Sequence, residues 1–197
     1  METNFFNNFI ENFFEAIEND FESAMKKQNV KKLSVVNYKI DVIDYVNGSE
    51  NPIIDSIKEG KEGAELYILN QSTPYCVEEI FHPFSLAALA DKVCGEEDKY
   101  IKILENFYIS CEEMTRNFLN QQNLQSLNIE DEGFEVLAIS GATGTFLLAD
   151  GIVKNIFIEH NRVFLDIKND DDQLVRAHIV ECNASDLALL LSNLIVD

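Results

Sequence analysis

The chain has 197 residues, 46% of them hydrophobic, and its 35 acidic residues against 15 basic ones give a formal charge of -20. The hydrophobic fraction is that of ordinary globular proteins, which excludes intrinsic disorder, and the length favours a single domain. The charge argues against direct binding to DNA, RNA or anionic lipid, because a surface with so much negative charge repels all three.

The N-terminal residues and the cysteines indicate a cytoplasmic protein. Residues 1–5 lack the positive charge that begins a signal peptide, and no stretch reaches the roughly 18 apolar residues that span a bilayer. None of the four cysteines, at positions 76, 94, 111 and 182, forms a CxxC pair or another metal-ligand spacing. Cytoplasmic thiols normally stay reduced, so we expect buried free cysteines and neither a metal nor a cofactor.

A long amphipathic helix is predicted over residues 4–28. Its apolar residues recur at helical spacing and fill an arc of roughly 200°, which is wider than the apolar stripe of an ordinary surface helix. The opposite face is acidic, so the helix packs on protein and not on a membrane. The helix serves either the core alone or both the core and an interface, and Phe5, Phe9 and Phe13 are the candidates for contacts with a partner or with a second copy of the chain.

The next segments predict short strands and one short helix. Residues 33–46 are rich in β-branched residues and tyrosine and end at an asparagine-glycine turn, which indicates one long or two short strands. Pro52 suits the first turn of a short helix that reaches Glu59. Residues 65–69 follow as an alternating or buried strand.

Two further helices are predicted in the centre of the chain. Pro83 begins the first and Gly95 ends it, because glycine readily adopts the left-handed conformation that follows many helices. The acidic residues 96–98 begin the second, where the helix dipole favours negative charge, and this helix extends to about Gln121. Residues 122–132 are polar and are predicted to form a loop.

The C-terminal third alternates apolar runs with turn signals, which is typical of antiparallel strands. Asp150-Gly151 and His160-Asn161 are both predicted to be two-residue turns, and residues 169–173 form a polar turn. The apolar runs around these turns predict a five-stranded antiparallel meander that begins at 134–140 and 145–149 and continues over 152–159, 162–168 and 174–178.

The positions of the turns determine the register of the meander. They place Phe164 opposite His178 and Asp166 opposite Arg176, so that ring faces ring and opposite charges pair. One face then carries Phe146, Leu148, Val153, Phe157, Phe164 and His178. The other carries Ile156, Ile158, Val163, Leu165 and Ile179. One helix cannot cover both faces, so either the N-terminal helices cover the face that the C-terminal helix leaves open, or that face is exposed and recruits a partner.

These elements predict an α+β fold. An antiparallel β-meander in the C-terminal third is packed by N-terminal, central and C-terminal helices, the last of them capped by Asn183. We expect one domain over residues 1–197. It can include two sub-lobes, a mainly helical one with short strands over 1–121 and the meander with the C-terminal helix over 133–197.

Three patterns suggest chemistry, and each has a simpler structural interpretation. Cys76 and His82 lie close enough in an irregular stretch to act as nucleophile and base, but no third group that would orient the imidazole is identifiable. A cysteine in an apolar context is usually inert, and His82, just before Pro83, also fits a helix N-cap region. Residues 140–144 resemble the opening of the nucleotide-binding loop of short-chain dehydrogenases; Leu147 replaces its third glycine, which favours a hairpin connection. The acidic run 169–172 lacks the glycine and distal glutamate of a calcium loop and fits a solvated turn.

The charge and the apolar surfaces favour a non-enzymatic, acidic cytoplasmic protein that binds another protein. A basic partner is expected, because uniform negative charge accelerates its association, and the role would be that of an inhibitor, an immunity-type protein or a regulator. The candidate interaction residues are Phe5, Phe9, Phe13, Phe157, Phe164 and His178. Two alternatives remain: a DNA mimic that inhibits a DNA-binding enzyme, and a small thiol-dependent enzyme that uses Cys76 and His82.

Overall fold

The computed structural model describes residues 5–27, 30–36, 39–45, 54–60, 63–68, 75–76, 83–130, 133–140 and 146–195. The chain divides into two compact units, one made of Met1–Glu11 with Leu104–Asp197 and the other of Asn12–Ile103. The expectation of a single folded domain over residues 1–197 stays a prediction.

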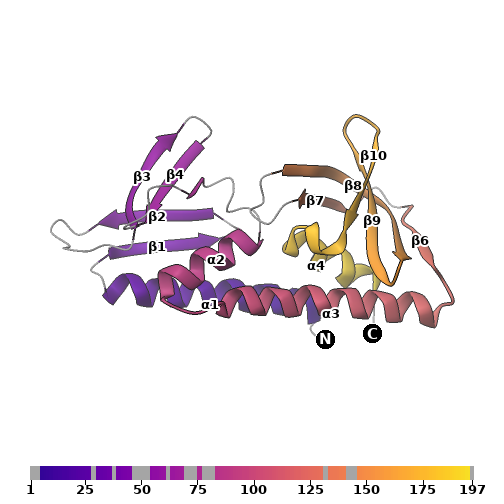
Figure 1. Ribbon diagram of the computed structural model, residues 1–197, viewed down its shortest axis with the longest axis horizontal. Helices are drawn as coiled ribbons and strands as arrows, with labels where there is room; N and C mark the ends of the chain where they lie inside the picture. The colour runs from indigo at the N-terminus through magenta and orange to yellow at the C-terminus, as the bar shows by residue number, and fades with distance from the viewer. Residues whose placement is uncertain are drawn as a thin grey trace. The chain divides into compact units, whose positions relative to one another are not determined.

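The described residues form an α+β fold with four α-helices (Figure 1). The helices are α1 (Phe5–Lys27), α2 (Pro83–Cys94), α3 (Lys99–Gln121) and α4 (Ala184–Leu194). The strands are β1 (Val30–Val36), β2 (Lys39–Tyr45), β3 (Ile54–Gly60), β4 (Gly63–Ile68), β5 (Tyr75–Cys76), β6 (Ser126–Asn128), β7 (Glu135–Ser140), β8 (Phe146–Glu159), β9 (Arg162–Asn169) and β10 (Leu174–His178). This confirms the predicted class, and none of the described helices is long and apolar enough to cross a bilayer.

The unit over residues 12–103 contains two small antiparallel sheets. β1 pairs with β2, and β4 lies between β3 and β5. The predicted short helix from Pro52 to Glu59 is wrong, because Ile54–Gly60 forms β3 and pairs with β4 from Ile54↔Ile68 to Gly60↔Gly63. The backbone bonds of a neighbouring strand outweigh the weak helix-starting preference of a proline, as tertiary context commonly does.

The junction between α2 and α3 follows the prediction closely. Gly95 has a positive φ of 71°, and the Glu96 N–H donates to the carbonyl of Asp91 at 2.8 Å, which is the Schellman ending of a helix. The buried carboxylate of Asp91 then accepts from the N–H groups of Tyr100 and Ile101, at 2.8 and 3.2 Å. The Asp91 side chain of α2 therefore accepts hydrogen bonds from two of the backbone N–H groups that have no partner within the first turn of α3.

The sheet of the other unit has the strand order β10-β9-β8-β6, and β7 also pairs with β8. His160 and Asn161 have φ values of 48° and 64°, as a type I′ turn requires, and they join β8 to β9. The predicted register is confirmed throughout this region. The pairs are Glu159↔Arg162, Ile158↔Val163, Ile156↔Leu165, Asp166↔Arg176 and Phe164↔His178.

Two predictions for this sheet are wrong. Asp150-Gly151 is not a turn, because β8 runs through it as one strand of 14 residues, and Gly151 pairs with Val136 on one side and Asn169 on the other. The segment 122–132 is not wholly a loop, because Ser126–Asn128 forms β6 and pairs with β8. The sheet has five strands, as predicted, but their identities differ. The fifth strand is β6, and the strand expected over residues 145–149 is the first part of β8.

The core of this unit lies between α3, α4 and one face of the sheet. Its fully buried side chains include Leu104, Phe107, Tyr108, Cys111 and Leu119 of α3, Val136, Ala138, Val153, Ile156, Val163, Leu165, Ile167 and Ala177 of the sheet, and Ala184, Leu187, Ala188, Leu190 and Leu191 of α4. Val153 was expected on the opposite face. A β-bulge between Val153 and Asn155 shifts the alternation there, so Val153 is buried with Ile156.

Replacement of Gly151 by alanine tests the continuous strand. A Cβ at this position would lie 2.1 Å from the backbone carbonyl oxygen of Lys168 on β9, so Gly151→Ala must push two paired strands apart. We expect a loss of about 3 kcal/mol in the free energy of unfolding, measured by urea denaturation.

Gly133→Ala is the matched control. A Cβ at Gly133 would have nothing within 4 Å, so the change should stay within about 0.5 kcal/mol of the wild type. Equal stability of the two variants would contradict the close approach of β9 to Gly151.

Candidate functional site

An aromatic row crosses three adjacent strands on the face of the sheet opposite the core. Phe157 of β8 stacks on Phe164 of β9 with 5.8 Å between ring centroids, and Phe164 lies 5.2 Å from the ring of His178 of β10. All three side chains are partly exposed. We call Phe157, Phe164 and His178 the aromatic ladder. Three of the six candidate residues are thus brought together, because the register places them side by side.

Charged side chains border the ladder and hold a cation against it. The guanidinium of Arg176 lies 4.3 Å above the ring of Phe157. It donates to Asp166 at 3.2 Å and to Glu159 at 3.3 Å. An aromatic face flanked by two carboxylates is a favourable site for a guanidinium, since the ring quadrupole and both anions attract it. This surface therefore already binds one cation, supplied by the chain itself.

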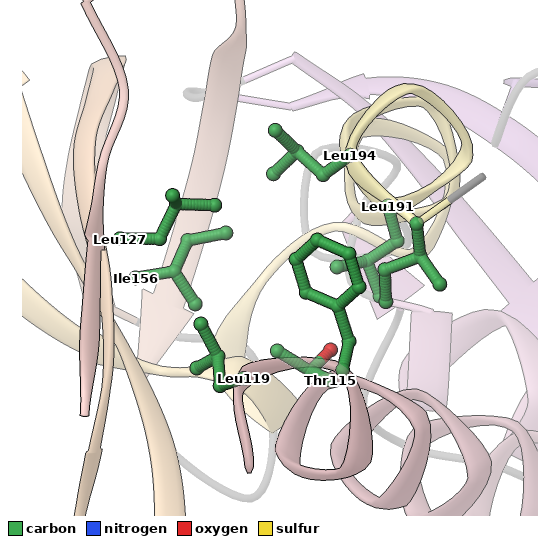
Figure 2. A pocket seen from close by; sticks show the side chains of 8 residues that line it. Thr115, Leu119, Leu127, Ile156, Leu191 and Leu194 are labelled. Carbon is green, nitrogen blue, oxygen red and sulfur yellow. The ribbon is translucent and has the colours of Figure 1, made fainter. Parts of the chain in front are cut away.

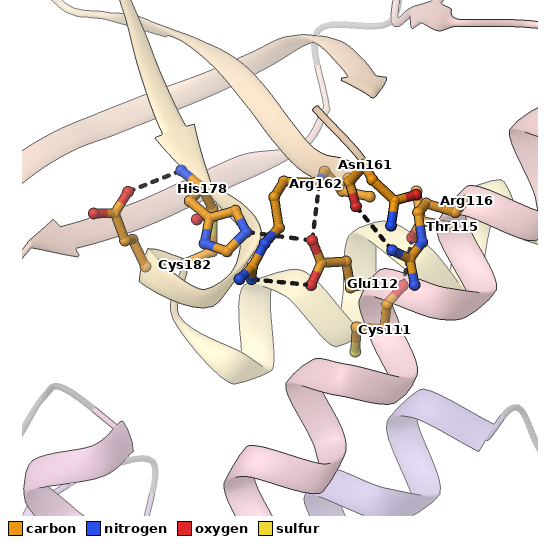
Figure 3. Close-up of polar contacts among 10 residues, drawn as sticks. Cys111, Glu112, Thr115, Arg116, Asn161, Arg162, His178 and Cys182 are labelled. Carbon is orange, nitrogen blue, oxygen red and sulfur yellow. Dashed lines mark hydrogen bonds and ion pairs between the residues drawn. The ribbon is translucent and has the colours of Figure 1, made fainter. Parts of the chain in front are cut away.

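A buried carboxylate of α3 orients the other end of the ladder (Figure 3). The Glu112 side chain, only 10% exposed, accepts from the backbone N–H of Val163 at 3.1 Å. Its oxygens lie 3.4 Å from Nε2 of His178 and 3.7 Å from Nη1 of Arg162. A carboxylate at this nitrogen favours the tautomer with the proton on Nε2, so the ring of His178 is held toward α3.

A second contact from α3 reaches the turn between β8 and β9. Nη1 of Arg116 donates to the backbone carbonyl of Asn161 at 2.8 Å, as Figure 3 shows. Arg116 lies one helical turn after Glu112, so both side chains project from the same side of α3. Together they attach the turn and the start of β9 to the helix, which fixes the position of Phe164 two residues further on.

Two buried cysteines lie near residues of this cluster in the chain: Cys111 precedes Glu112, and Cys182 follows His178 by four residues. Sγ of Cys182 lies 3.7 Å from the carbonyl oxygen of His178. Cys182 is fully buried, and burial raises the pKa of its thiol well above the ordinary value, as it also does for Cys111. Such thiols stay protonated at neutral pH. Over the described ranges, no three His, Cys, Asp or Glu side chains form a group that could hold a metal ion.

The candidate residues of α1 lie in different environments. Phe5 is 43% exposed, and Phe9 stacks on Phe107 of α3 with 4.7 Å between centroids. Phe13 is only 3% exposed and meets the ring of Tyr100 edge to face at 6.2 Å. Phe13 therefore belongs to the core of the folded chain, whereas Phe5 presents apolar surface to the solvent. An interface between two copies of the chain through this helix stays a prediction.

Several sequence candidates fall outside the described residues. Cys76 ends β5, but its side chain and the whole of His82 are outside them, so the proposed nucleophile and base stay untested. Residues 141–145 of the glycine-rich segment are outside them too, and a strand follows that segment, as predicted. The acidic run forms the turn between β9 and β10, where Oδ1 of Asn169 accepts from the N–H groups of Asp171 and Gln173.

Glu112 and Arg162 are the site residues that the sequence reasoning missed. Glu112 was set aside because carboxylates are abundant in a chain with 35 acidic residues. Its position carried a usable signal: it lies four residues after Tyr108 and three before Thr115, both of them buried. A carboxylate on the buried stripe of a helix needs donors from a neighbouring element.

Comparisons with known proteins do not indicate a function. No protein-family model, curated protein or solved structure matches the chain significantly. The arrangement that these residues form can bind cations and aromatic or apolar groups at the ladder, and the buried thiol of Cys182 beside it has a raised pKa.

Removal of the Glu112 carboxylate tests its part in holding the sheet to α3. Glu112→Ala leaves the backbone N–H of Val163 and the ring Nε2 of His178 without their carboxylate partner, so we expect a loss of about 1–3 kcal/mol in the free energy of unfolding. Glu113→Ala removes the same charge from the exposed neighbour and should change stability by less than about 0.5 kcal/mol. Equal effects in urea denaturation would show that only the net charge matters.

Thiol labelling tests the burial of the cysteines. At neutral pH, a mild alkylating reagent should modify Cys94, Cys111 and Cys182 far more slowly in the native protein than in urea. Burial, followed by the nearby charge of Asp20, raises the pKa of Cys94 to about 11, so its labelling should accelerate only in strong alkali. Mass spectrometry of the labelled peptides gives the result. Selective rapid labelling of Cys76 would favour the thiol-enzyme alternative instead.

Proposed function

We propose that this protein binds another protein through the aromatic ladder and that the contact surface of the partner is basic. The protein acts without catalysis, as an inhibitor, an immunity-type protein or a regulator in the cytoplasm. The observation that carries the proposal is the seating of the Arg176 guanidinium on Phe157 between Asp166 and Glu159. We expect a lysine or arginine of the partner to contact the exposed parts of these rings and carboxylates.

The charge of the whole chain supports this proposal. A net charge of -20 produces an attractive field for a basic protein, and such a field raises association rates at low salt. A cation stacked on a partly exposed ring contributes about 0.5–1 kcal/mol, and more once the partner displaces water. The field therefore brings the partner to the surface, and the ladder adds short-range contacts that fix its orientation.

The arrangement of charges around the ladder favours this function over that of a DNA mimic. A mimic needs a continuous series of carboxylates in place of phosphates. On this face, Asp166 and Glu159 alternate with Arg176 and Arg162, which neutralise part of the local charge. Phe157 and Phe164 occupy the centre of the patch, where a mimic would require anions.

Replacement of Phe164 by alanine tests the ladder as a binding site. Tagged wild-type protein and Phe164→Ala are used to capture partners from the native cell extract at low and high salt, and the affinity of each captured partner is then measured by calorimetry. We expect a basic partner that the variant binds at least about tenfold more weakly, equivalent to about 1.4 kcal/mol. High salt should weaken the wild-type complex.

Leu189→Ala is the control, since Leu189 is an exposed apolar residue of α4, and it should bind as the wild type does. Glu159→Gln serves as a second test that leaves the rings in place, and it should weaken binding mainly through a slower association rate. A partner that binds Phe164→Ala and the wild type equally, or an acidic partner, would refute the proposal.

A further inference from the structure

β6 is the outermost strand on one side of the five-stranded sheet, and one of its edges is open. The N–H of Ile158 donates to the carbonyl of Gln125, and the N–H of Ile129 donates to the carbonyl of Lys154, both at 2.9 Å. In an antiparallel pair, alternate residues bond to the neighbouring strand. The backbone groups of Gln125 and Ile129 therefore face β8, whereas those of Ser126 and Asn128 face outward.

The outward groups of β6 have no partner within the described part of the chain. Ser126 and Asn128 are both exposed, and no hydrogen bond joins their outward N–H and C=O groups to any residue in the described ranges. An open edge of this kind is a template for an additional strand, since the outward groups bond readily to another extended backbone.

A groove lies directly beside this edge. It has a volume of about 390 Å³ and is lined by Leu127, Asn128, Ile129, Glu130, Phe134 and Leu194. Most of these side chains are apolar, and Glu130 adds a negative charge at an exposed position. A strand added to β6 would place every second side chain on the side of the sheet where this groove lies.

The smaller cavity next to the groove is not a binding site. It shares Leu127 and Leu194 with the groove, but its volume is about 10 Å³, and it is lined by side chains of α3, α4, β6 and β8 (Figure 2). A space of this size holds no ligand side chain, and its apolar lining offers no partners to a water molecule. It is a packing defect of the core, whereas the groove outside it is open.

We propose that an extended, basic segment of a partner protein adds to the sheet at β6, bonds to the backbone of Ser126 and Asn128, and inserts an apolar side chain into the groove. Lysine or arginine residues of the segment would lie near Glu130. Charge identifies this occupant, because a second copy of the chain also carries -20 and would be repelled. This site uses strands and side chains other than those of the ladder, so it does not depend on the function proposed above.

A proline at position 128 distinguishes binding by strand addition from non-specific electrostatic binding. The N–H of Asn128 points away from β8, so Asn128→Pro removes a donor for the added strand but no bond to β8. Asn128→Ala keeps the donor and is the matched control. The probe is a short fluorescent peptide that alternates lysine with valine or leucine, titrated into the full-length protein and followed by fluorescence anisotropy. We expect the proline variant to bind at least about tenfold more weakly, and the alanine variant to match the wild type.

Hydrogen exchange locates the bound peptide. In the wild type, the amides of Ser126 and Asn128 should become protected when the peptide is present. Equal affinity of Asn128→Pro and Asn128→Ala, or protection elsewhere, would overturn the proposal. So would a loss of peptide binding in Phe164→Ala alone, which would place the peptide on the ladder. Protection of the same amides without peptide, increasing with protein concentration, would identify a second copy of the chain as the occupant.

A charge reversal provides the decisive variant if the proline destabilises the fold. Glu130→Lys alters an exposed side chain at the groove and leaves the backbone of β6 intact. It should weaken binding of the lysine peptide and strengthen binding of a peptide with glutamate at the lysine positions. Unchanged preference for the lysine peptide would overturn the assignment of the groove.

Discussion

The register of β8 against β9 determines which side chains of the large sheet reach the core and which reach the solvent. Because side chains alternate along a strand, Ile156, Val163 and Leu165 are buried while Phe157 and Phe164 lie on the other face. A shift of one residue would exchange the two sets. The His160-Asn161 turn, with both φ values positive, fixes that register locally, and its attachment to α3 through Glu112 and Arg116 maintains it.

The two proposed binding surfaces are consequences of this one arrangement. The outward face of the sheet brings together an aromatic ladder and carboxylates that already hold a guanidinium. At the outermost strand on the β6 side, the same antiparallel pairing leaves the backbone of Ser126 and Asn128 facing outward beside a groove. Both proposals expect positively charged partners, because the field of a chain with a charge of -20 attracts them. They differ in their contacts, since one offers side chains and the other offers backbone groups.

Two buried carboxylates show how a very acidic chain uses charge within its fold. Asp91 accepts two backbone N–H groups at the start of α3, and Glu112 joins the middle of the same helix to β9 and to His178. A buried carboxylate is costly without donors, so each occurs where backbone N–H groups and a helix terminus or a cation compensate it. Most acidic residues whose burial the structure describes are exposed, whereas these two connect elements of secondary structure.

Local chemistry was enough to predict the α+β class, the four helices, the His160-Asn161 turn and the register that follows from it, because periodicity, caps and turn dipeptides act within a few residues. The tertiary structure decided what depends on a neighbouring strand or helix. β3 replaced a short helix because β4 pairs with it. Gly151 lies inside β8 because it pairs with β7 on one side and β9 on the other, and β9 approaches too closely for a side chain there. The same limit applies to the site: the aromatic ladder followed from the register, but the role of Glu112 did not, since one carboxylate among many is distinguished only by the donors that the folded chain places around it.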